Sequence, residues 1–539
     1  METQVYLLSW LDWLSVVVYL GILAAMGYYF SRRQNGADEY FVGKRDIPGW
    51  AVGISMFATL LSSFTFIAFP GFAYDRSWEI LMREFMAPIC VAIAAVTVIP
   101  IYRQAIRMSA YEYLERRFGY AARVYGNLGF MFGHFFKISV VMFTMSVALN
   151  SITGWDITTI IVILGAVTVV YTSVGGIKGV IWTDVIQGIL MLGTGLMTVA
   201  YLVFIASPSP GTLFAEAAQD GKFRLINPEF SMTKETVYVF MFFGMFQFLT
   251  KYGTDQTMVQ RYLLSPSRKD TVRAMFISVA CCMVAWITFS LIGSLLYGFY
   301  QINADRLPEG MKGDKVFPYF IARELPIGVT GLVLAGLFSA TMSTLSSDLN
   351  SVGAVVIGDY YDRFAKNPTD KGRFRLSLGI VVGAGVVSVA VAILLATYKG
   401  NIMQMTMDAA TIIGTLISGG ILAAFVLGFF CRRANAKGLY TAIISGFIVG
   451  GWCLWTGAKG DQLPSSLSFL EYRLHMWWLW GFSNIFVFVV GYLVSIAFGK
   501  GELVDERLTV YGYRNQSAAD EHAGEQRAQD GTHGDAVER

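Results

Sequence analysis

Long apolar runs alternate with short polar segments along almost the whole chain. Each run holds about 20 residues with few charges, which is the length an α-helix needs to cross the hydrocarbon core of a bilayer. Backbone groups inside a bilayer must be paired within the protein, and these runs are too long and continuous for barrel strands, so helices are expected throughout. The pattern predicts about thirteen spans, at residues 9–30, 49–73, 84–102, 122–150, 156–173, 180–206, 236–254, 272–300, 325–350, 376–397, 403–431, 438–457 and 476–498.

The composition agrees with a polytopic membrane protein. The chain has 539 residues, of which 55% are hydrophobic and 15% charged, against about 25% charged residues in soluble proteins. Its net charge of +3 is too small to predict a nucleic-acid partner. No HExxH, Walker A or GxSxG motif is present, so the sequence does not predict an enzyme.

The distribution of Lys and Arg predicts the orientation. The loops that follow odd-numbered spans carry about twice the basic residues of the other loops, which places them in the cytoplasm. The N-terminus is then outside and the C-terminus inside. Residues 499–539 are polar and lack apolar periodicity, so they are expected to form a disordered cytoplasmic tail.

One apolar span contains an unusual number of hydroxyl groups. The stretch FSATMSTLSSDLN, residues 338–350, places Ala340, Ser343, Thr344 and Ser347 on one face of a helix. Hard cations bind oxygen ligands, so an ion site is one interpretation. Hydroxyls in membrane helices also bond their own helix or allow close helix packing, and the pattern alone leaves both open.

Two other spans are candidates for interruption. The second, 49–73, contains Ser62 and Ser63 followed by Pro70-Gly71, and the seventh, 236–254, contains Gly244 and Gly253. Interrupted helices at matching places in two halves point to the binding site of a transporter. Spans 2–6 and 7–11 are therefore expected to form inverted repeats.

Several ionisable residues fall at membrane depth, where charges are expensive. Asp184 is either an interfacial acid that faces water or Lys178, or the anion of a buried Na⁺ site. Lys137 and Glu84 either contact substrate or form structural ion pairs. His134 is expected to be a packing residue, and Asp408 has no predicted partner.

Five stretches together resemble the sodium:solute symporter family, which includes sodium/glucose cotransporters and, most similar here, bacterial sialic acid symporters. They are DEYFVGKRDIPGWAVGISMFATLLSSFTF, SAYEYLERRFG, YTSVGGIKGVIWTDVIQG, DQTMVQRYL and GLFSATMSTLSSDLNS followed by GDYY. The resemblance implies an all-α membrane fold with the five-plus-five inverted repeat of the leucine-transporter type. Residues 1–46 would hold one extra helix and a cytoplasmic loop, 47–431 the core with repeats at about 47–206 and 235–431, and 432–498 two C-terminal helices.

The resemblance also implies the sites. Two Na⁺ would be carried per substrate, the first bound by Ala58, Leu61, Ala340, Ser343 and Thr344 and the second by Ser346, Ser347 and Asp184. Substrate would lie near Ser62, Thr65, Glu84, Lys137 and Gln247. Ser339 and Thr341 would only pack, and Asp348 would be solvated near the cytoplasmic end.

The implied function is Na⁺-driven import of a sugar or a sugar acid such as sialic acid across the plasma (inner) membrane, by a protein that works as a monomer. The sialic acid symporters carry arginine where this chain has Lys137 and glutamine where it has Glu84, so a neutral sugar and a sugar acid both stay open. A Na⁺-coupled symporter of a small organic acid or amino acid, and a non-transporting solute sensor, are the alternatives.

Overall fold

The computed structural model describes residues 8–32, 46–106, 109–207, 209–397, 402–416, 419–459, 472–498 and 506–512. Within these ranges every regular element is helical, as expected. The main helices are α1 (Trp10–Ser31), α3 (Gly49–Leu60), α4 (Ser63–Asp75), α5 (Leu81–Glu84), α6 (Met86–Ala105), α7 (Tyr111–Phe118), α8 (Tyr120–Thr153), α9 (Ile157–Tyr201), α10 (Pro210–Gln219), α11 (Val237–Thr254), α12 (Gln256–Leu264), α13 (Arg268–Ile302), α14 (Gly313–Arg323), α15 (Val329–Val356), α16 (Asp362–Phe364), α17 (Asp370–Leu395), α18 (Ile402–Leu416), α19 (Ile421–Phe430), α20 (Ala436–Lys459) and α21 (Trp478–Ala497).

The expected spans fall on these helices. Nine helices of the described chain are long and apolar enough to cross a membrane, and counting each of two bent pairs as one span raises the number to eleven. The remaining two expected spans lie on the shorter apolar helix Ile157–Thr172 and on α11, which has 18 residues. Thirteen membrane crossings therefore stays a prediction. The expected tail lies largely outside the described residues.

The second span is broken, as the sequence predicts. Helices α3 and α4 meet at a 60° bend, where Leu61 and Ser62 have extended backbone angles. The last bond of α3 runs from the Leu61 N–H to the Phe57 carbonyl, and α4 starts its own ladder at the Ser62 carbonyl. A helix end leaves carbonyl groups that must find partners elsewhere. The break therefore exposes backbone oxygens in the interior of the protein.

The seventh span differs from the expectation. Helix α11 runs through Gly244 and Gln247 without interruption and ends at Thr254, where extended Asp255 separates it from α12. Gly244 has a packing role, because a Cβ there would lie 2.3 Å from the Arg83 carbonyl oxygen. The predicted break is thus displaced to the end of the span. A second bent pair occurs instead in the eleventh span, where α18 and α19 meet at 52°.

Spans five and six join in one helical element. Helix α9 continues across both, with a kink at Gly176, whose φ of 54° is in the region that favours glycine.

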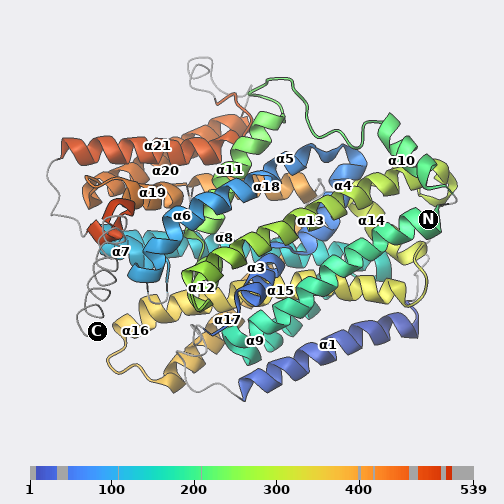
Figure 1. Cartoon of the computed structure of the whole chain (residues 1–539), viewed down its shortest axis with the longest axis horizontal. Helices are drawn as coiled ribbons and strands as arrows, with labels where there is room; N and C mark the ends of the chain where they lie inside the picture. Colours follow the sequence, from blue (N-terminus) through green and yellow to red (C-terminus); the bar gives the residue numbers. More distant parts are fainter. Residues whose placement is uncertain are drawn as a thin grey trace, which may run out of the picture.

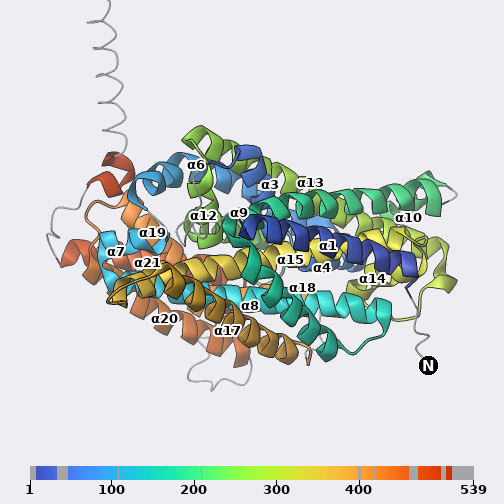
Figure 2. The same cartoon turned by 90° about the horizontal axis from the view of Figure 1, so that it is seen from below.

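Helix α15, which carries the hydroxyl-rich stretch, lies in the interior. It packs against α9, α1, α8, α17 and α3, and nearly all of its side chains are buried. Figure 1 shows α1 along the lower edge and α20 and α21 along the upper edge, and Figure 2 also places α15 amid the other helices. Large apolar side chains on α1, such as Val17 at 61% exposed, face outward as expected for a lipid-facing helix. The hydroxyls of α15 are therefore shielded from lipid.

Candidate functional site: two oxygen clusters and a cavity

The break in the second span faces the hydroxyls of α15. The Ser343 hydroxyl donates to the Ala58 carbonyl at 2.9 Å, and the Thr344 hydroxyl donates to the Leu61 carbonyl at 2.9 Å. The Ala340 carbonyl lies 3.1 Å from the Thr344 hydroxyl and 3.4 Å from that of Ser343. We call these five residues the carbonyl cluster. All five are fully buried or nearly so, and their oxygens carry no formal charge.

This arrangement is chemically suited to a hard cation. Each hydroxyl oxygen keeps lone pairs and can rotate its hydrogen away, so five uncharged oxygens could turn toward one ion. The family resemblance implied that these five residues lie together, and the structure brings all of them together. Ser339 and Thr341 instead bond the carbonyls of Ala335 and Leu337 on their own helix, as expected for packing residues.

A second group of oxygens surrounds Asp184, which is fully buried. Its Oδ2 accepts from the Ser55 hydroxyl at 2.6 Å and from the Ser347 hydroxyl at 3.3 Å. Asp184 is therefore not the interfacial acid of the alternative interpretation, and Lys178 pairs with Asp46. The Ser346 hydroxyl turns away and donates to the Ser343 carbonyl at 3.3 Å. We call Asp184, Ser346 and Ser347 the Asp184 cluster.

An arginine that sequence reasoning missed completes this group. The Arg261 guanidinium, also fully buried, lies 3.0 Å from Asp184 Oδ2 and 2.6 Å from the Ser347 hydroxyl. Arg261 belongs to the stretch DQTMVQRYL of the sequence analysis, but nothing in that stretch indicates that Asp184 is its partner. Asp184 Oδ1 is buried without a hydrogen-bond partner among the described residues. One oxygen of the carboxylate is thus satisfied by arginine and the other is free to accept a cation.

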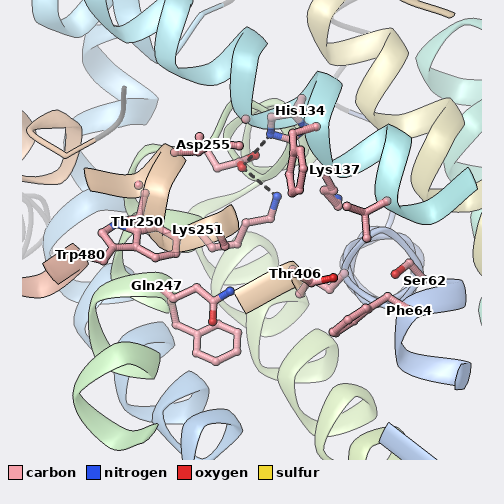
Figure 3. A pocket seen from close by; sticks show the side chains of 18 of the residues that line it. Ser62, Phe64, His134, Lys137, Gln247, Thr250, Lys251, Asp255, Thr406 and Trp480 are labelled. Atoms are coloured by element: carbon pink, nitrogen blue, oxygen red, sulfur yellow. Dashed lines mark hydrogen bonds and ion pairs between the residues drawn. The ribbon is translucent and has the colours of Figure 1, made fainter. Parts of the chain in front are cut away.

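A cavity of about 310 Å³ lies beside the break. All five residues expected at the substrate line it, and they come from α4 and its N-cap, α5, α8 and α11: Ser62, Thr65, Glu84, Lys137 and Gln247. Figure 3 shows Gln247, Lys137 and Ser62 around the same space, with Thr406 between Gln247 and Ser62. Its walls mix aromatic rings with polar groups, as small-molecule sites do.

The cavity charges are paired. Arg83 binds Glu84, its neighbour in sequence, with Arg83 Nε 2.6 Å from Glu84 Oε1. Lys251 lies 2.8 Å from Asp255. Glu84 therefore has a positive partner that the sequence analysis did not identify, which offsets its repulsion of an anionic substrate.

Lys137 is held by Asp348, and the expectation that Asp348 is solvated is wrong. The Lys137 ammonium lies 3.1 Å from Asp348 Oδ2, and Asp348 is fully buried. Asp348 is four residues after Thr344, so it projects from the same buried face of α15 one turn further along. That spacing was a signal available in the sequence.

Two further residues have partners that the sequence did not suggest. His134 is not only a packing residue, because its ring lies between Asp255 and Asp348, 3.0 and 3.1 Å away. Asp408 accepts from the Trp477 indole at 3.1 Å and from Gln404 at 2.9 Å.

Known proteins resemble this chain in sequence and in fold. Residues 40–447 match the model of the sodium:solute symporter family. The chain is 32% identical to the sodium/sialic acid symporter NanT of Aliivibrio fischeri, covering 94% of this chain and 96% of that protein. It is 35% identical to the sodium/sialic acid symporter SiaT of Proteus mirabilis, covering 81% of this chain and 88% of that one.

Solved structures agree. A Na⁺-coupled sialic acid symporter in a substrate-bound, outward-open state aligns with a TM-score of 0.82 at 31% identity, over 92% of this chain and 99% of that one. Mhp1, a nucleobase-cation-symport-1 transporter, aligns with a TM-score of 0.52 at 16% identity, over 87% and 97%, and shows only the fold, which is of the leucine-transporter type. The match over residues 40–447 and the identity to full-length symporters show that this membrane protein belongs to the sodium:solute symporter family.

Proposed function

We propose that this protein is a Na⁺-driven secondary active symporter that imports a small polar organic solute, a sugar or a sugar acid such as sialic acid, by alternating access. The observation that carries this proposal is the carbonyl cluster, in which hydroxyls of α15 lie 2.9 Å from the carbonyl oxygens freed at the break of the second span. Uncharged oxygens can ligate a metal ion but do not carry a proton at neutral pH, which favours Na⁺ coupling.

The first Na⁺ is assigned to Ala58, Leu61, Ala340, Ser343 and Thr344. Because the cluster joins two helices far apart in sequence, an ion there would hold the two parts together. Inward opening would separate the break from α15 and remove ligands, which releases the ion.

The second Na⁺ is assigned to Asp184, Ser346 and Ser347. Support comes from the buried and unpaired Asp184 Oδ1 and from the Ser347 hydroxyl beside the carboxylate. Ser346 would have to rotate its hydroxyl from the Ser343 carbonyl to take part. The coupling would then be two Na⁺ per substrate.

The substrate is assigned to the cavity, with Ser62, Thr65, Glu84, Lys137 and Gln247 as its polar contacts. The core of residues 47–431 would form two repeats, at about 47–206 and 235–431, that move against each other around the break. The N-terminus would be outside the inner membrane, the C-terminus would be cytoplasmic, and a monomer would be the transporting unit.

The test is uptake by the purified protein in liposomes under an imposed Na⁺ gradient, with a panel of hexoses, sialic acids and small organic acids. Accumulation of one solute that stops when K⁺ replaces Na⁺ is the expected result. The symporter proposal fails if no solute accumulates and Na⁺ leaves the melting temperature unchanged relative to K⁺.

A further inference from the structure

A histidine joins two carboxylates at the wall of the cavity. We call His134, Asp255 and Asp348 the histidine bridge. Nε2 of His134 lies 3.0 Å from Asp255 Oδ2 in a hydrogen bond, and Nδ1 lies 3.1 Å from Asp348 Oδ1 in an ion-pair contact. Figure 3 shows the His134 ring, Asp255 and Lys251 connected by dashed contacts. His134 comes from the first expected repeat, whereas both carboxylates come from the second.

The bridge requires a proton beyond those of a neutral histidine. A neutral imidazole has one N–H donor and one lone pair, and an ionised carboxylate only accepts. Here both ring nitrogens lie about 3 Å from a carboxylate oxygen. The Nδ1 contact is not aligned as a hydrogen bond, but a lone pair on either ring nitrogen would still be repelled by the carboxylate oxygen that faces it. Two N–H groups, one on each nitrogen, satisfy both contacts.

The neighbouring charges cancel without this proton. Lys137 of α8 pairs with Asp348 of α15, and Lys251 of α11 pairs with Asp255. The other groups beside the bridge are uncharged: the Phe130 ring on α8, with its centroid 4.1 Å from that of His134, and on α12 Thr257, which bonds Asp255. Tyr111 of α7, which lines the same cavity, adds an uncharged hydroxyl.

The same cancellation holds for the whole cavity. Among the described residues that line it, the remaining ions are Arg83 and Glu84, which bind each other. With His134 neutral, the cavity and the Asp348 behind it carry no net charge. With His134 protonated, the net charge is +1. The proton is therefore the one unbalanced charge available to an anionic solute.

We propose that His134 is protonated when the substrate binds, and that this proton supplies the positive charge with which the cavity receives a carboxylate-bearing solute. This inference rests on the proposed function and specifies its substrate as an organic anion. Lys137 alone does not fill that role, because Asp348 already neutralises it.

The test measures binding of N-acetylneuraminate, the probe anion, to the purified protein in saturating Na⁺ between pH 6 and pH 9. If only the protonated form binds, the apparent Kd of the parent rises about tenfold per pH unit once His134 loses its proton, because the competent fraction falls by that factor. In the His134→Gln variant the side chain cannot take up a proton, so its Kd is weak and independent of pH. The matched control is His475→Gln, a histidine outside the cavity, which keeps the parent's pH dependence.

A second variant keeps the inference testable if His134→Gln does not fold. Asp255→Asn retains a side chain that can cap α12 but leaves Lys251 without its carboxylate partner, so the cavity carries a net charge of +1 even when His134 is neutral. Binding of N-acetylneuraminate should then persist to higher pH than in the parent. The inference is overturned if the parent binds equally well at every pH, or if His134→Gln loses affinity with rising pH as the parent does.

Uptake assays distinguish a failure of the proton hypothesis from a failure of the proposed symporter function. If Na⁺-driven uptake of N-acetylneuraminate is constant between pH 6 and pH 9, the protein is a symporter but the role of the His134 proton is contradicted. The same holds if only neutral solutes are taken up with Na⁺. If no solute is taken up with Na⁺ at any pH, both the proposed function and the inference are wrong.

Discussion

The carbonyl cluster and the Asp184 cluster sit next to each other on α15, yet they are built from different chemistry. The first consists of backbone carbonyls and hydroxyls, with hydroxyl-to-carbonyl distances of 2.9 Å and no charged group. The second contains a buried carboxylate and a buried guanidinium 3.0 Å apart.

The difference concerns what balances a bound ion. A cation in the carbonyl cluster meets only dipoles, so nothing in that cluster has to be displaced except hydroxyl hydrogens. A cation in the Asp184 cluster has to share its carboxylate with Arg261. Burying charges is costly unless they are paired, so Arg261 stabilises Asp184 when no ion is present but competes with an ion when one arrives. Neighbouring positions on one helix can thus offer a neutral site and a charge-compensated site.

The largest effect is expected from the carbonyl cluster. Thr344→Ala removes one hydroxyl ligand of the proposed ion, and a contact between a hydroxyl and a charged group is worth about 1.5–3 kcal/mol. The Na⁺ concentration for half-maximal uptake should therefore rise by about 10- to 100-fold.

The matched control is Thr341→Ala, three positions earlier, whose hydroxyl bonds only its own helix. It should leave Na⁺ dependence within about twofold of the parent, since an exchanged local bond is worth about 1 kcal/mol or less. Equal Na⁺ affinity in Thr344→Ala and Thr341→Ala would contradict the role of the cluster.

The next effect tests whether Asp184 binds an ion or only balances Arg261. Asp184→Asn leaves a buried guanidinium without its counter-ion, a loss of about 3–5 kcal/mol, so it should lower both stability and coupling. The double variant Asp184→Asn with Arg261→Gln removes both charges and should recover stability.

The decisive quantity is the number of Na⁺ carried per substrate, read from the reversal potential in liposomes. A ratio of one in the double variant against two in the parent supports a second Na⁺ site. A ratio of two in both would leave Asp184 as the partner of Arg261 alone.

A smaller effect separates the two serines of the Asp184 cluster. Among the described residues, Ser347 contacts Asp184, Arg261 and Thr59, whereas Ser346 bonds only the Ser343 carbonyl. From these contacts Ser347→Ala should weaken Na⁺-driven uptake more than Ser346→Ala does, by several-fold, or about 1 kcal/mol. If both variants lose the same Na⁺ affinity in Na⁺ titrations, Ser346 also ligates the bound ion.

The smallest effect comes from an ionic contact away from both clusters. Glu235, just before α11, pairs with Arg76 and lies 3.8 Å from His475. Burial alone would raise the pKa of Glu235, but the nearby His475 and the charge of Arg76 outweigh it and hold the pKa below its usual value. Its ionic contribution is present above pH about 4.3 and is lost as the pH falls through the lower folded-state pKa.

Glu235→Gln should therefore lower the melting temperature at pH 7 by about 2 °C or less. The difference from the parent should shrink as the pH falls below about 4.3. A difference that grows toward acid pH would mean that Glu235 is not ionised in the folded protein.

Local patterns predicted much of this site. The Ser-rich, Pro-containing second span indicated a helix break, and the hydroxyl spacing indicated an ion site on α15 as one of two interpretations. The family resemblance joined the two through the carbonyls of Ala58 and Leu61. The break in the seventh span was misplaced because Gly244 marks close packing against Arg83 rather than a helix end.

The ion pairs could not be predicted in the same way. Arg261 and Asp184 are 77 residues apart, and Lys137 and Asp348 are 211 apart, so no local period links them. Only the fold brings them together. Asp348 is the exception, since its position one turn after Thr344 already placed it on the buried face.

The break in the second span has a consequence for how ion affinity can vary. Three of the five oxygens assigned to the first Na⁺ belong to the main chain, at positions 58, 61 and 340, so replacing those side chains leaves the oxygen atoms in place. Genetic variation can alter this part of the shell only by moving the backbone. Each of the side-chain hydroxyls at positions 343 and 344 can be lost by a single substitution. Heritable adjustment of the carbonyl cluster is therefore concentrated on two side chains of α15, and its main-chain ligands are protected from changes in side-chain identity.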